Sequence, residues 1–332
     1  MRRFTRLFCI CALAIGAAGE SGAATKLVIG TVPNVGDGAS ICAIERGYFR
    51  EVDLEVDINP FRTASDMTPL IVRGDLAMIG GGVSASYFNS VAQGMPLRYF
   101  INRAQAPVWH GLILRKEFEG RAKTIRDIKG LRIGISATGG ISEYELGKAL
   151  EAAGLSLDDV ETKPLGAPQA IAAIQNGAID GAVFVPPFDA AAIKGGGFKL
   201  LEIDETVKPR MEVGGLFYNT DWAAKNRDVL DRFALAHIRG GRCYLEAARG
   251  GANRNEMIDY FVKYSPIKDR AIFADMVWSE INPDGRVMVD SLLDQQAFYA
   301  RRGYVPKTSP IEALFDDGPV KRALEKLGAV GK

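Results

Sequence analysis

Leu27-Val28-Ile29-Gly30 is a short apolar run that ends in glycine, and Leu131-Arg132-Ile133-Gly134 repeats the pattern later in the chain. Each run is followed by a loop of small residues and then a helical pattern. A further glycine, Gly74 or Gly177, closes a helix before the next apolar run. The interval from the first glycine to the second is 44 positions in one half and 43 in the other. Two α/β units of nearly equal length predict two lobes with a cleft between them, and such clefts bind small ligands.

The bulk composition is that of a folded protein with more than one domain. The chain has 332 residues, of which 47% are hydrophobic and 24% are charged, and this balance is not typical of disordered or membrane-embedded proteins. The formal net charge of +1 provides no basic field for nucleic acid. We therefore expect no nucleic-acid partner.

The first 24 residues have the pattern of a secretory signal peptide. Three arginines precede an apolar run over residues 7–18, and small residues follow up to Ala24. The run is shorter than the roughly 20 residues that a membrane-spanning helix needs. The sequence therefore predicts a periplasmic protein whose signal peptide, residues 1–24, is cleaved near Ala24.

Two cysteines, Cys42 and Cys243, lie beyond the predicted signal peptide. They could pair in an oxidising compartment. Each lies in a helical pattern, however, and buried free thiols are common in protein cores. The sequence favours free thiols and leaves a disulfide as the alternative.

The order of the predicted elements indicates how the lobes are divided. Strands and helices alternate through the first part of the chain, which predicts mostly parallel sheets flanked by helices. From about residue 221 the pattern is largely helical, with a separate helix predicted over 268–279, and we expect this tail to pack on the first lobe. Lobe 1 would then comprise residues 25–108 and 212–332, and lobe 2 residues 109–211. The two crossings between lobes would form a hinge.

The loop from Ser136 to Ser142 is the strongest candidate for a ligand site. Ligands of open α/β sheets bind beyond the carboxyl ends of strands, and this loop follows a strand and precedes a helix. Its backbone N–H groups and the helix dipole favour an anionic group such as a sulfonate, carboxylate or phosphate. A turn in which Ser142 only caps the helix is the simpler alternative. The candidates in this loop are Thr138, Gly139, Gly140 and Ser142.

The loops after the first three strands of the first half lie on the same predicted rim. Polar residues there could contact a ligand or only form Asx turns. Three consecutive glycines, residues 80–82, indicate a close approach to a ligand, because glycine is entropically costly in a strand. The candidates in these loops are Asn34, Asp37, Thr63, Ser65, Gly81 and Gly82.

Aromatic residues near the predicted cleft could cover the apolar body of a ligand. Trp109 and His110 lie at the first crossing, and His110 could also donate a hydrogen bond. Pro187 and Phe188 follow a strand of the second half. Packing in the hinge or in the core is the alternative for each of these residues.

Motifs of catalysis and of cofactor binding are absent from the sequence. The chain has two histidines, His110 and His237, and no metal-ligand spacing, nucleophile elbow or nucleotide-binding loop. We therefore expect a protein that is not an enzyme and that carries no cofactor and no metal ion.

Five segments of the chain carry a family resemblance. They are AIERGYFREVDLEV (43–56), VRGDLAMIGGG (72–82) with AQGMPLRYF (92–100), DIKGLRIGIS (127–136), AIQNGAIDGAVFVPP (173–187) and NPDG (282–285). Taken in order, they resemble the periplasmic substrate-binding proteins of ABC transporters, in the sulfonate/nitrate/taurine-type group that includes pyrimidine-precursor binders. One departure is Asp53, where that group usually has glycine; aspartate can also adopt the left-handed conformation.

The resemblance implies a two-lobed, type II periplasmic-binding fold. It also implies a monomer that captures a small anionic or polar molecule and delivers it to a membrane permease. The ligand would be of the sulfonate, aromatic carboxylate or pyrimidine class. Two alternatives remain: an enzyme similar to pyrimidine synthases of the same fold, and the binding protein of a tripartite, non-ABC transporter.

Overall fold

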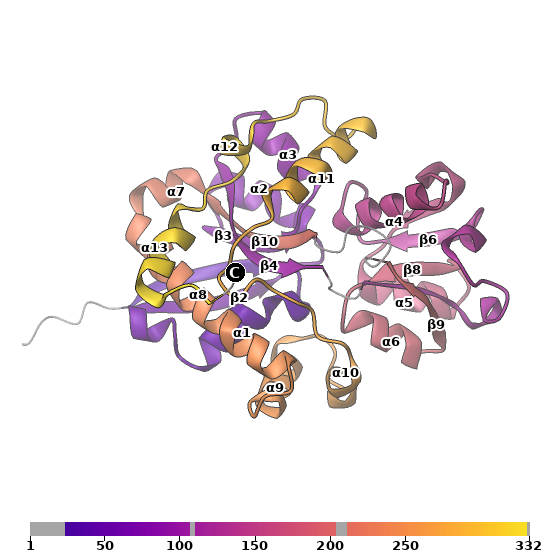
Figure 1. The fold of residues 1–332 in the computed structure, drawn as a ribbon, viewed down its shortest axis with the longest axis horizontal. Coiled ribbons are helices and arrows are strands. Elements are labelled where there is room, and N and C mark those ends of the chain that lie inside the picture. Colours follow the sequence, from indigo (N-terminus) through magenta and orange to yellow (C-terminus); the bar gives the residue numbers. More distant parts are fainter. Residues whose placement is uncertain (1–23, 107–109, 204–210, 331–332) are drawn as a thin grey trace, which may run out of the picture.

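The computed structural model describes residues 24–106, 110–203 and 211–330, and every structural statement below concerns these residues. Figure 1 shows two lobes side by side, each built on a five-stranded sheet with helices around it. In the part of the chain that is described, no helix is long and apolar enough to cross a membrane. The predicted two-lobed fold is therefore confirmed.

The first lobe contains the sheet with strand order β2-β1-β3-β10-β4. Strands β1 and β2 are parallel, as are β1 and β3, whereas β10 runs antiparallel to both of its neighbours. The strands of this sheet are β1 (Thr25–Thr31), β2 (Leu54–Pro60), β3 (Met78–Gly82), β4 (Leu97–Gln105) and β10 (Glu212–Asn219).

The second lobe contains the sheet with strand order β7-β6-β8-β5-β9. Strand β6 is parallel to β7 and β8, and β5 is antiparallel to β8 and β9. Its strands are β5 (Gly111–Arg115), β6 (Arg132–Ile135), β7 (Glu161–Pro164), β8 (Gly181–Phe184) and β9 (Gly197–Glu202).

The two sheets have the same topology, which explains the repeat in the sequence. Gly30 lies in β1 and Gly134 lies in β6, and these strands take equivalent positions in the two sheets. The prediction of mostly parallel sheets is confirmed: in each sheet four of the five strands run in the same direction, and one strand, β10 or β5, is antiparallel to its neighbours. Strands β5 and β10 each follow a crossing from the other lobe and enter their sheet from the opposite direction. The predicted lobe boundaries, at residues 108/109 and 211/212, lie in or beside the undescribed segments 107–109 and 204–210 and stay a prediction.

Thirteen α-helices are described, and they surround the two sheets (Figure 1). Those before the second crossing are α1 (Gly38–Glu45), α2 (Ala64–Arg73), α3 (Ala85–Ala92), α4 (Ile141–Ala152), α5 (Ala167–Gln175) and α6 (Phe188–Lys194). Those of the tail are α7 (Thr220–Lys225), α8 (Arg227–Ala248), α9 (Arg254–Tyr264), α10 (Arg270–Asp275), α11 (Val289–Arg301), α12 (Ile311–Leu314) and α13 (Gly318–Leu327).

Left-handed residues end helices where the sequence predicts them. Gly74 follows α2 with a φ of 83°, and Gly177 lies just beyond α5 with a φ of 77°. Asp53 takes the left-handed conformation with a φ of 55° before β2, so the turn survives the replacement of glycine. These conformations let each chain segment turn directly from a helix into the next strand.

The helical tail packs on the first lobe, as expected, and it also reaches the second. Helix α8 lies against α1 and α13, whereas α11 packs between α3 of the first lobe and α4 of the second. The predicted helix over 268–279 is wrong in length: α10 ends at Asp275, and Trp278 turns inward, where its indole N–H donates to the Phe273 carbonyl.

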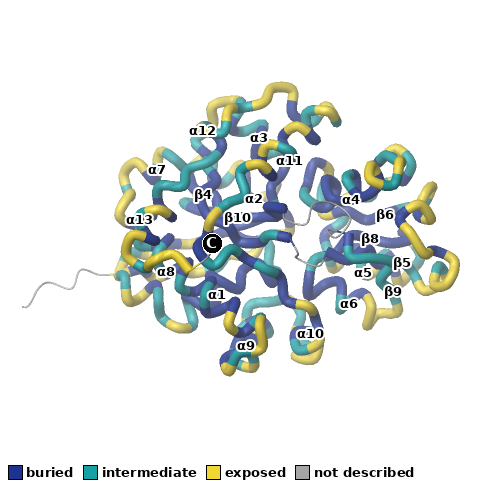
Figure 2. Tube along the Cα trace, viewed as in Figure 1, coloured by how far each residue is buried: buried dark blue, intermediate teal, exposed yellow. Residues whose placement is uncertain are grey.

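Buried residues concentrate in the strands and in the helix faces that pack on them (Figure 2). One hydrophobic core cluster includes residues of both lobes. Phe88 of α3 lies 6.0 Å from Tyr299 of α11, and Tyr144 of α4 lies 5.1 Å from Phe298 of α11, measured between ring centroids. Burial of such aromatic surface stabilises the contact between lobes by the hydrophobic effect. Helix α11 is thus held by both lobes.

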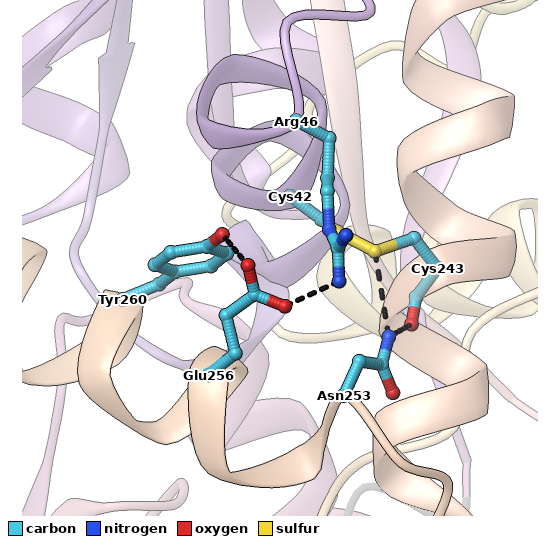
Figure 3. Close-up of a disulfide and its surroundings, with 6 residues drawn as sticks. All are labelled: Cys42, Arg46, Cys243, Asn253, Glu256 and Tyr260. Carbon is cyan, nitrogen blue, oxygen red and sulfur yellow. Dashed lines mark hydrogen bonds and ion pairs between the residues drawn. A yellow bond between two sulfur atoms is a disulfide. The ribbon is translucent and has the colours of Figure 1, made fainter.

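Cys42 and Cys243 form a disulfide, so the expectation of two free thiols was wrong. Cys42 lies in α1 and Cys243 in α8, with their Cα atoms 6.4 Å apart, and Figure 3 shows the bond between the two helices. Gly240 of α8 leaves room for this approach, since a Cβ there would lie 2.1 Å from the Ala39 carbonyl oxygen. Both cysteines were predicted to lie in helices, but no local pattern shows that these two helices cross at the cysteines.

Glu212, at the start of β10, is expected to make the stability of the folded protein depend on pH. Its buried carboxylate accepts hydrogen bonds from the Tyr99 hydroxyl, the Asn102 amide and the Met288 backbone N–H. Burial raises its pKa from 4.5 to about 7, although these hydrogen bonds oppose the shift. The folded state therefore holds a proton that the unfolded state releases between pH 4.5 and about 7.

The stabilisation by protonated Glu212 should be complete below pH 4.5. The free energy of unfolding should then fall by about 3 kcal/mol as the pH rises through the pKa that Glu212 has in the folded state. The Glu212→Gln variant should lose this dependence. Urea unfolding at several pH values between 5 and 8, on wild type and variant, measures the two slopes. Equal slopes would show that Glu212 does not titrate in this range.

Candidate functional site

A cavity of about 130 Å³ lies between the two lobes, beyond the carboxyl ends of their strands. Both sheets contribute to its walls, as expected for two α/β units that face each other. Its lining is largely apolar, with a few hydrogen-bonding side chains. The lining residues are Val32, Asn34, Arg62, Thr63, Gly82, Ser84, His110, Gly134, Ile135, Ser136, Ala137, Gly140, Ile141, Ser142, Leu165, Gly166, Ala167, Ala170, Val183, Phe184, Val185 and Phe188.

The first lobe presents helix-capping residues to the cavity. Asn34 follows β1, and its side chain accepts a hydrogen bond from the Gly36 N–H. Thr63 follows β2 and caps α2, and Ser84 follows β3 and caps α3. These caps place the N-terminal ends of α2 and α3 at the cavity.

The second lobe presents the loop between β6 and α4. The Ser142 hydroxyl accepts a hydrogen bond from the Ser136 N–H at 2.8 Å and lies 2.8 Å from the Ser136 hydroxyl. Gly140 precedes α4, and Gly166 precedes α5. Phe188, the first residue of α6, supplies an aromatic wall.

The helix dipoles and the one charged side chain of the described lining are positive. The N-terminal ends of α2, α3, α4 and α5 converge on the cavity, and each carries a partial positive charge. Arg62 adds a full positive charge, and the described lining contains no aspartate or glutamate. Arg62 also pairs with Asp66, at 3.5 Å, but both side chains are exposed, so the pair is weak and can rearrange. The arrangement suits an anionic group.

His110 is the titratable side chain that lies deepest in the wall. Its Nδ1 lies 2.7 Å from a carboxylate oxygen of Glu145, which projects from α4, and both side chains are buried. This short contact places the carboxylate where it can orient the imidazole ring. Sequence analysis singled out His110 but gave no indication of Glu145.

The lobes meet directly at the edge of the cavity. The Ala85 N–H of the first lobe donates to the Gly139 carbonyl of the second at 2.8 Å, and the Gly139 N–H donates to the Glu143 carboxylate. A Cβ on Gly82 would lie 2.7 Å from Cγ2 of Ile141. The close approach that the glycine run allows at this position is therefore to the other lobe.

Seven of the fourteen predicted site residues line the cavity: Asn34, Thr63, Gly82, His110, Gly140, Ser142 and Phe188. Their contact with a ligand stays a prediction. Ser65 lies in α2, and Trp109 lies outside the described residues.

The other five predicted site residues do not line this cavity. Thr138 is exposed, Gly139 contacts the first lobe, and Gly81 pairs with Gly215 within the sheet. Asp37 is buried and lies 2.8 Å from the guanidinium of Arg103. Pro187 borders a separate, smaller hollow together with Asp37.

Arg62 is the most consequential lining residue that sequence reasoning missed. It lies in the turn RTASD after β2, the position that the strand-end rule selects. A basic residue at that position predicts a contact with an anion, whereas the sequence prediction named only the hydroxyl side chains beside it.

The model of the NMT1/THI5-like family matches residues 38–247 of this chain. The chain belongs to the NMT1/THI5-like family. The predicted resemblance is thereby confirmed, since it included the pyrimidine-precursor binders among the sulfonate- and nitrate-type proteins. The NMT1/THI5-like match covers β2 to β10 and most of the loops that line the cavity, whereas β1 and the Asn34 loop precede it. No curated protein matches the chain.

Solved structures show the same fold for this NMT1/THI5-like protein at low sequence identity. The periplasmic aliphatic sulphonate binding protein SsuA from Escherichia coli is 20% identical, with 88% of this chain and 92% of that chain covered, at a TM-score of 0.67. The periplasmic nitrate-binding protein NrtA from Synechocystis PCC 6803 is 13% identical, with 92% and 89% covered, at 0.74. The desulfurization enzyme DszB is 13% identical, with 91% and 99% covered, at 0.63. Both binding proteins and an enzyme thus share this architecture.

Proposed function

We propose that this protein is the solute-binding component of an ABC importer and that it captures a small organic anion between its lobes. The observation that carries the proposal is the positive, carboxylate-free lining of a cavity to which both lobes contribute. The NMT1/THI5-like family match and the likeness to periplasmic binding proteins support it. The protein would act as a monomer and would present its closed form to a membrane permease.

The size and lining of the cavity narrow the ligand class. Cavities of about 150 Å³ hold benzene, so a space of about 130 Å³ suits the apolar body of a small aromatic or branched aliphatic acid. Phe188 and Leu165 would contact the body, and Arg62 with the helix N-termini would hold the acidic group. A sulfonate or a carboxylate fits this arrangement better than a neutral pyrimidine.

Isothermal titration calorimetry with a panel of sulfonates, carboxylates and pyrimidines tests the proposal. We expect at least one acid to bind and to raise the melting temperature, because a ligand at about 100 times its Kd stabilises the folded state by about 2.7 kcal/mol. If no member of the panel bound, the cavity would not be a solute site of this class.

The Arg62→Ala variant should weaken binding of that acid about tenfold, because a hydrogen bond to a charged group contributes about 1.5–3 kcal/mol. The matched control is Arg73→Ala, which removes the same charge from the other end of α2, where Arg73 pairs with Asp75. Equal affinity losses in the two variants, measured by calorimetry, would rule out a direct contact by Arg62.

Periplasmic localisation of the mature chain belongs to the same proposal. Residues 1–23 lie outside the described part, and the predicted cleavage near Ala24 immediately precedes β1, which begins at Thr25. Mass spectrometry of the protein purified from the periplasmic fraction would give the mature N-terminus. Recovery of the full-length chain from the cytosol would contradict export.

An enzyme of the same fold is the second candidate, and the His110–Glu145 pair is the observation that favours it. A histidine oriented by a carboxylate is a common general base. Mass spectrometry of each bound acid after prolonged incubation with the protein would detect turnover. Chemically unchanged ligand is the result that our proposal expects.

A further inference from the structure

A buried histidine–carboxylate pair stands at the wall of the cavity. Nδ1 of His110 lies 2.7 Å from a carboxylate oxygen of Glu145, and the two side chains are 1% and 0% exposed. His110 is one of the residues that line the cavity, whereas Glu145 is not among them. An anion in the cavity would therefore lie beside the imidazole, with the Glu145 carboxylate one short contact further away.

The charge of this pair depends on one exchangeable proton. With that proton, His110 and Glu145 together carry no net charge, either as imidazolium and carboxylate or as imidazole and carboxylic acid. Without it, they carry a net charge of −1. A net charge in a buried place is costly, and a second negative charge close to it makes that state costlier still. A bound anion therefore favours the form of the pair that holds the proton.

The charged groups around the pair are matched among themselves. Asp189 of α6 lies near His110, and its carboxylate is 3.3 Å from the ammonium of Lys199 on β9. Burial raises the pKa of Asp189, and the charges of Lys199 and His110 oppose this rise. On the side of the first lobe, the Arg103 guanidinium lies 2.8 Å from the Asp37 carboxylate. Each of these cations faces a carboxylate of its own, so neither cancels the charge of the His110–Glu145 pair.

Two tyrosine hydroxyls also feel the charge of Glu145. Burial raises the pKa of Tyr144, and its hydrogen bond to Asp294 adds to the rise. Burial likewise raises the pKa of Tyr299. Both hydroxyls therefore stay neutral around physiological pH and do not exchange the proton.

We propose that the cavity takes up one proton together with its anion, and that Glu145 is the positioning residue that keeps this proton at His110. His110 faces the anion, and Glu145 acts through it. The proton comes from solvent and returns there when the anion leaves, so no co-reactant is needed. The inference rests on the proposed function and adds a regulation to it. Affinity for the anion falls as the pH rises above the range in which the unliganded pair holds its proton.

Calorimetry in two buffers with different enthalpies of ionisation measures the proton uptake of wild type directly. The probes are benzoate, benzenesulfonate and ethanesulfonate, which stay singly charged above about pH 6. For the probe that binds most tightly, we expect uptake to approach about one proton per ligand between about pH 6 and 9. The Kd should rise by up to about tenfold per pH unit in the same range. Equal heats in the two buffers at every pH, with a constant Kd, would overturn the inference.

The Glu145→Gln variant should lose the uptake above about pH 7, because an imidazole without a neighbouring carboxylate holds a proton less tightly. A double variant, His110→Asn with Glu145→Gln, has no titratable group in the pair and should show no uptake at any pH. A merely structural role for Glu145 would instead weaken binding equally at every pH and leave the uptake unchanged. That result, or uptake that persists in the double variant, would overturn the inference.

Two matched controls remove other buried carboxyl groups. Asp189→Asn removes the carboxyl nearest to the pair on α6, and Glu212→Gln removes one whose pKa is raised by burial to about 7. Neither residue lines the cavity, and both variants should keep the proton uptake of wild type. Loss of the uptake in either control, with its retention in Glu145→Gln, would assign the proton elsewhere and overturn the inference.

The two levels of the account fail differently. If a sulfonate or carboxylate binds without taking up a proton, the inference is overturned and the proposed function stands. If none of the three probes binds, the tightest-binding acid of the wider panel takes their place in the same measurement. If no acid of either set binds, the proposed function is overturned, and the inference falls with it.

Discussion

Replacing Cys42 and Cys243 with serine is expected to lower the free energy of unfolding by about 5 kcal/mol. The two residues are 201 positions apart in the sequence, so their cross-link removes a large loop-closure entropy from the unfolded chain. Urea unfolding of the oxidised wild type and of the double variant measures the difference.

The disulfide prediction has an internal control. In the presence of a reductant, wild type should have the same free energy of unfolding as the double variant. The reductant should not change the free energy of unfolding of the double variant. Affinity for a ligand should also be the same in both, because neither cysteine lines the cavity. A difference in unfolding free energy of under about 1 kcal/mol would mean that the cross-link does not constrain the unfolded chain as this model assumes.

Replacing Gly82 with valine is expected to weaken ligand binding about 10- to 100-fold. A Cβ at this position would lie 2.7 Å from Cγ2 of Ile141, so the side chain would hold the lobes apart. Overpacking of this kind costs about 1–3 kcal/mol, and that cost would fall on the closed state alone. The apparent affinity falls in proportion to the population of the binding-competent state.

A second substitution separates closure from damage to the site. Ile141 also lines the cavity, so the Ile141→Ala single variant is the reference. In that background Gly82→Ala meets no Cγ2 methyl group and should cost much less affinity than it costs in wild type. Small-angle X-ray scattering with saturating ligand should show a larger radius of gyration for Gly82→Val than for wild type. Equal radii and equal affinities would show that the lobes do not need the glycine in order to close.

The architecture could be predicted because short local sequence patterns indicate the strands, the helices and their order. The glycines that end strands, at Gly30 and Gly134, and those that close helices, at Gly74 and Gly177, place two equal units along the chain. The direction of β5 and β10 could not be predicted in this way. Their antiparallel entry depends on the path that the chain takes between lobes, and no local pattern encodes that path.

The candidate site could be predicted only in part, from the rule that ligands bind beyond the carboxyl ends of strands. That rule selects the correct loops, but it does not say which side of a loop faces the cavity. Thr138 and Gly139 lie in the loop that contributes Gly140 and Ser142, yet one is exposed and the other contacts Ala85. The angle between the lobes decides which loop residues contact the other lobe and which face the cavity.

The same limit applies to contacts between distant segments. The Cys42–Cys243 disulfide and the Asp37–Arg103 pair each join positions far apart in the chain, and each requires two elements to pack in one particular way. Asp37 was predicted either to contact a ligand or to form an Asx turn. In the structure its carboxylate pairs with Arg103, and burial nevertheless raises the pKa of this carboxyl.

The most direct test of the central claim compares one acid with its neutral isostere. Calorimetry at pH 7 would measure the Kd of the tightest-binding acid of the panel and of its primary amide or sulfonamide. A cavity formed by four helix N-termini and Arg62 should bind the acid about tenfold or more tightly, because charge-assisted hydrogen bonds are roughly twice as strong as neutral ones. Equal affinity for the two compounds, or tighter binding of the amide, would contradict an anion-binding cleft.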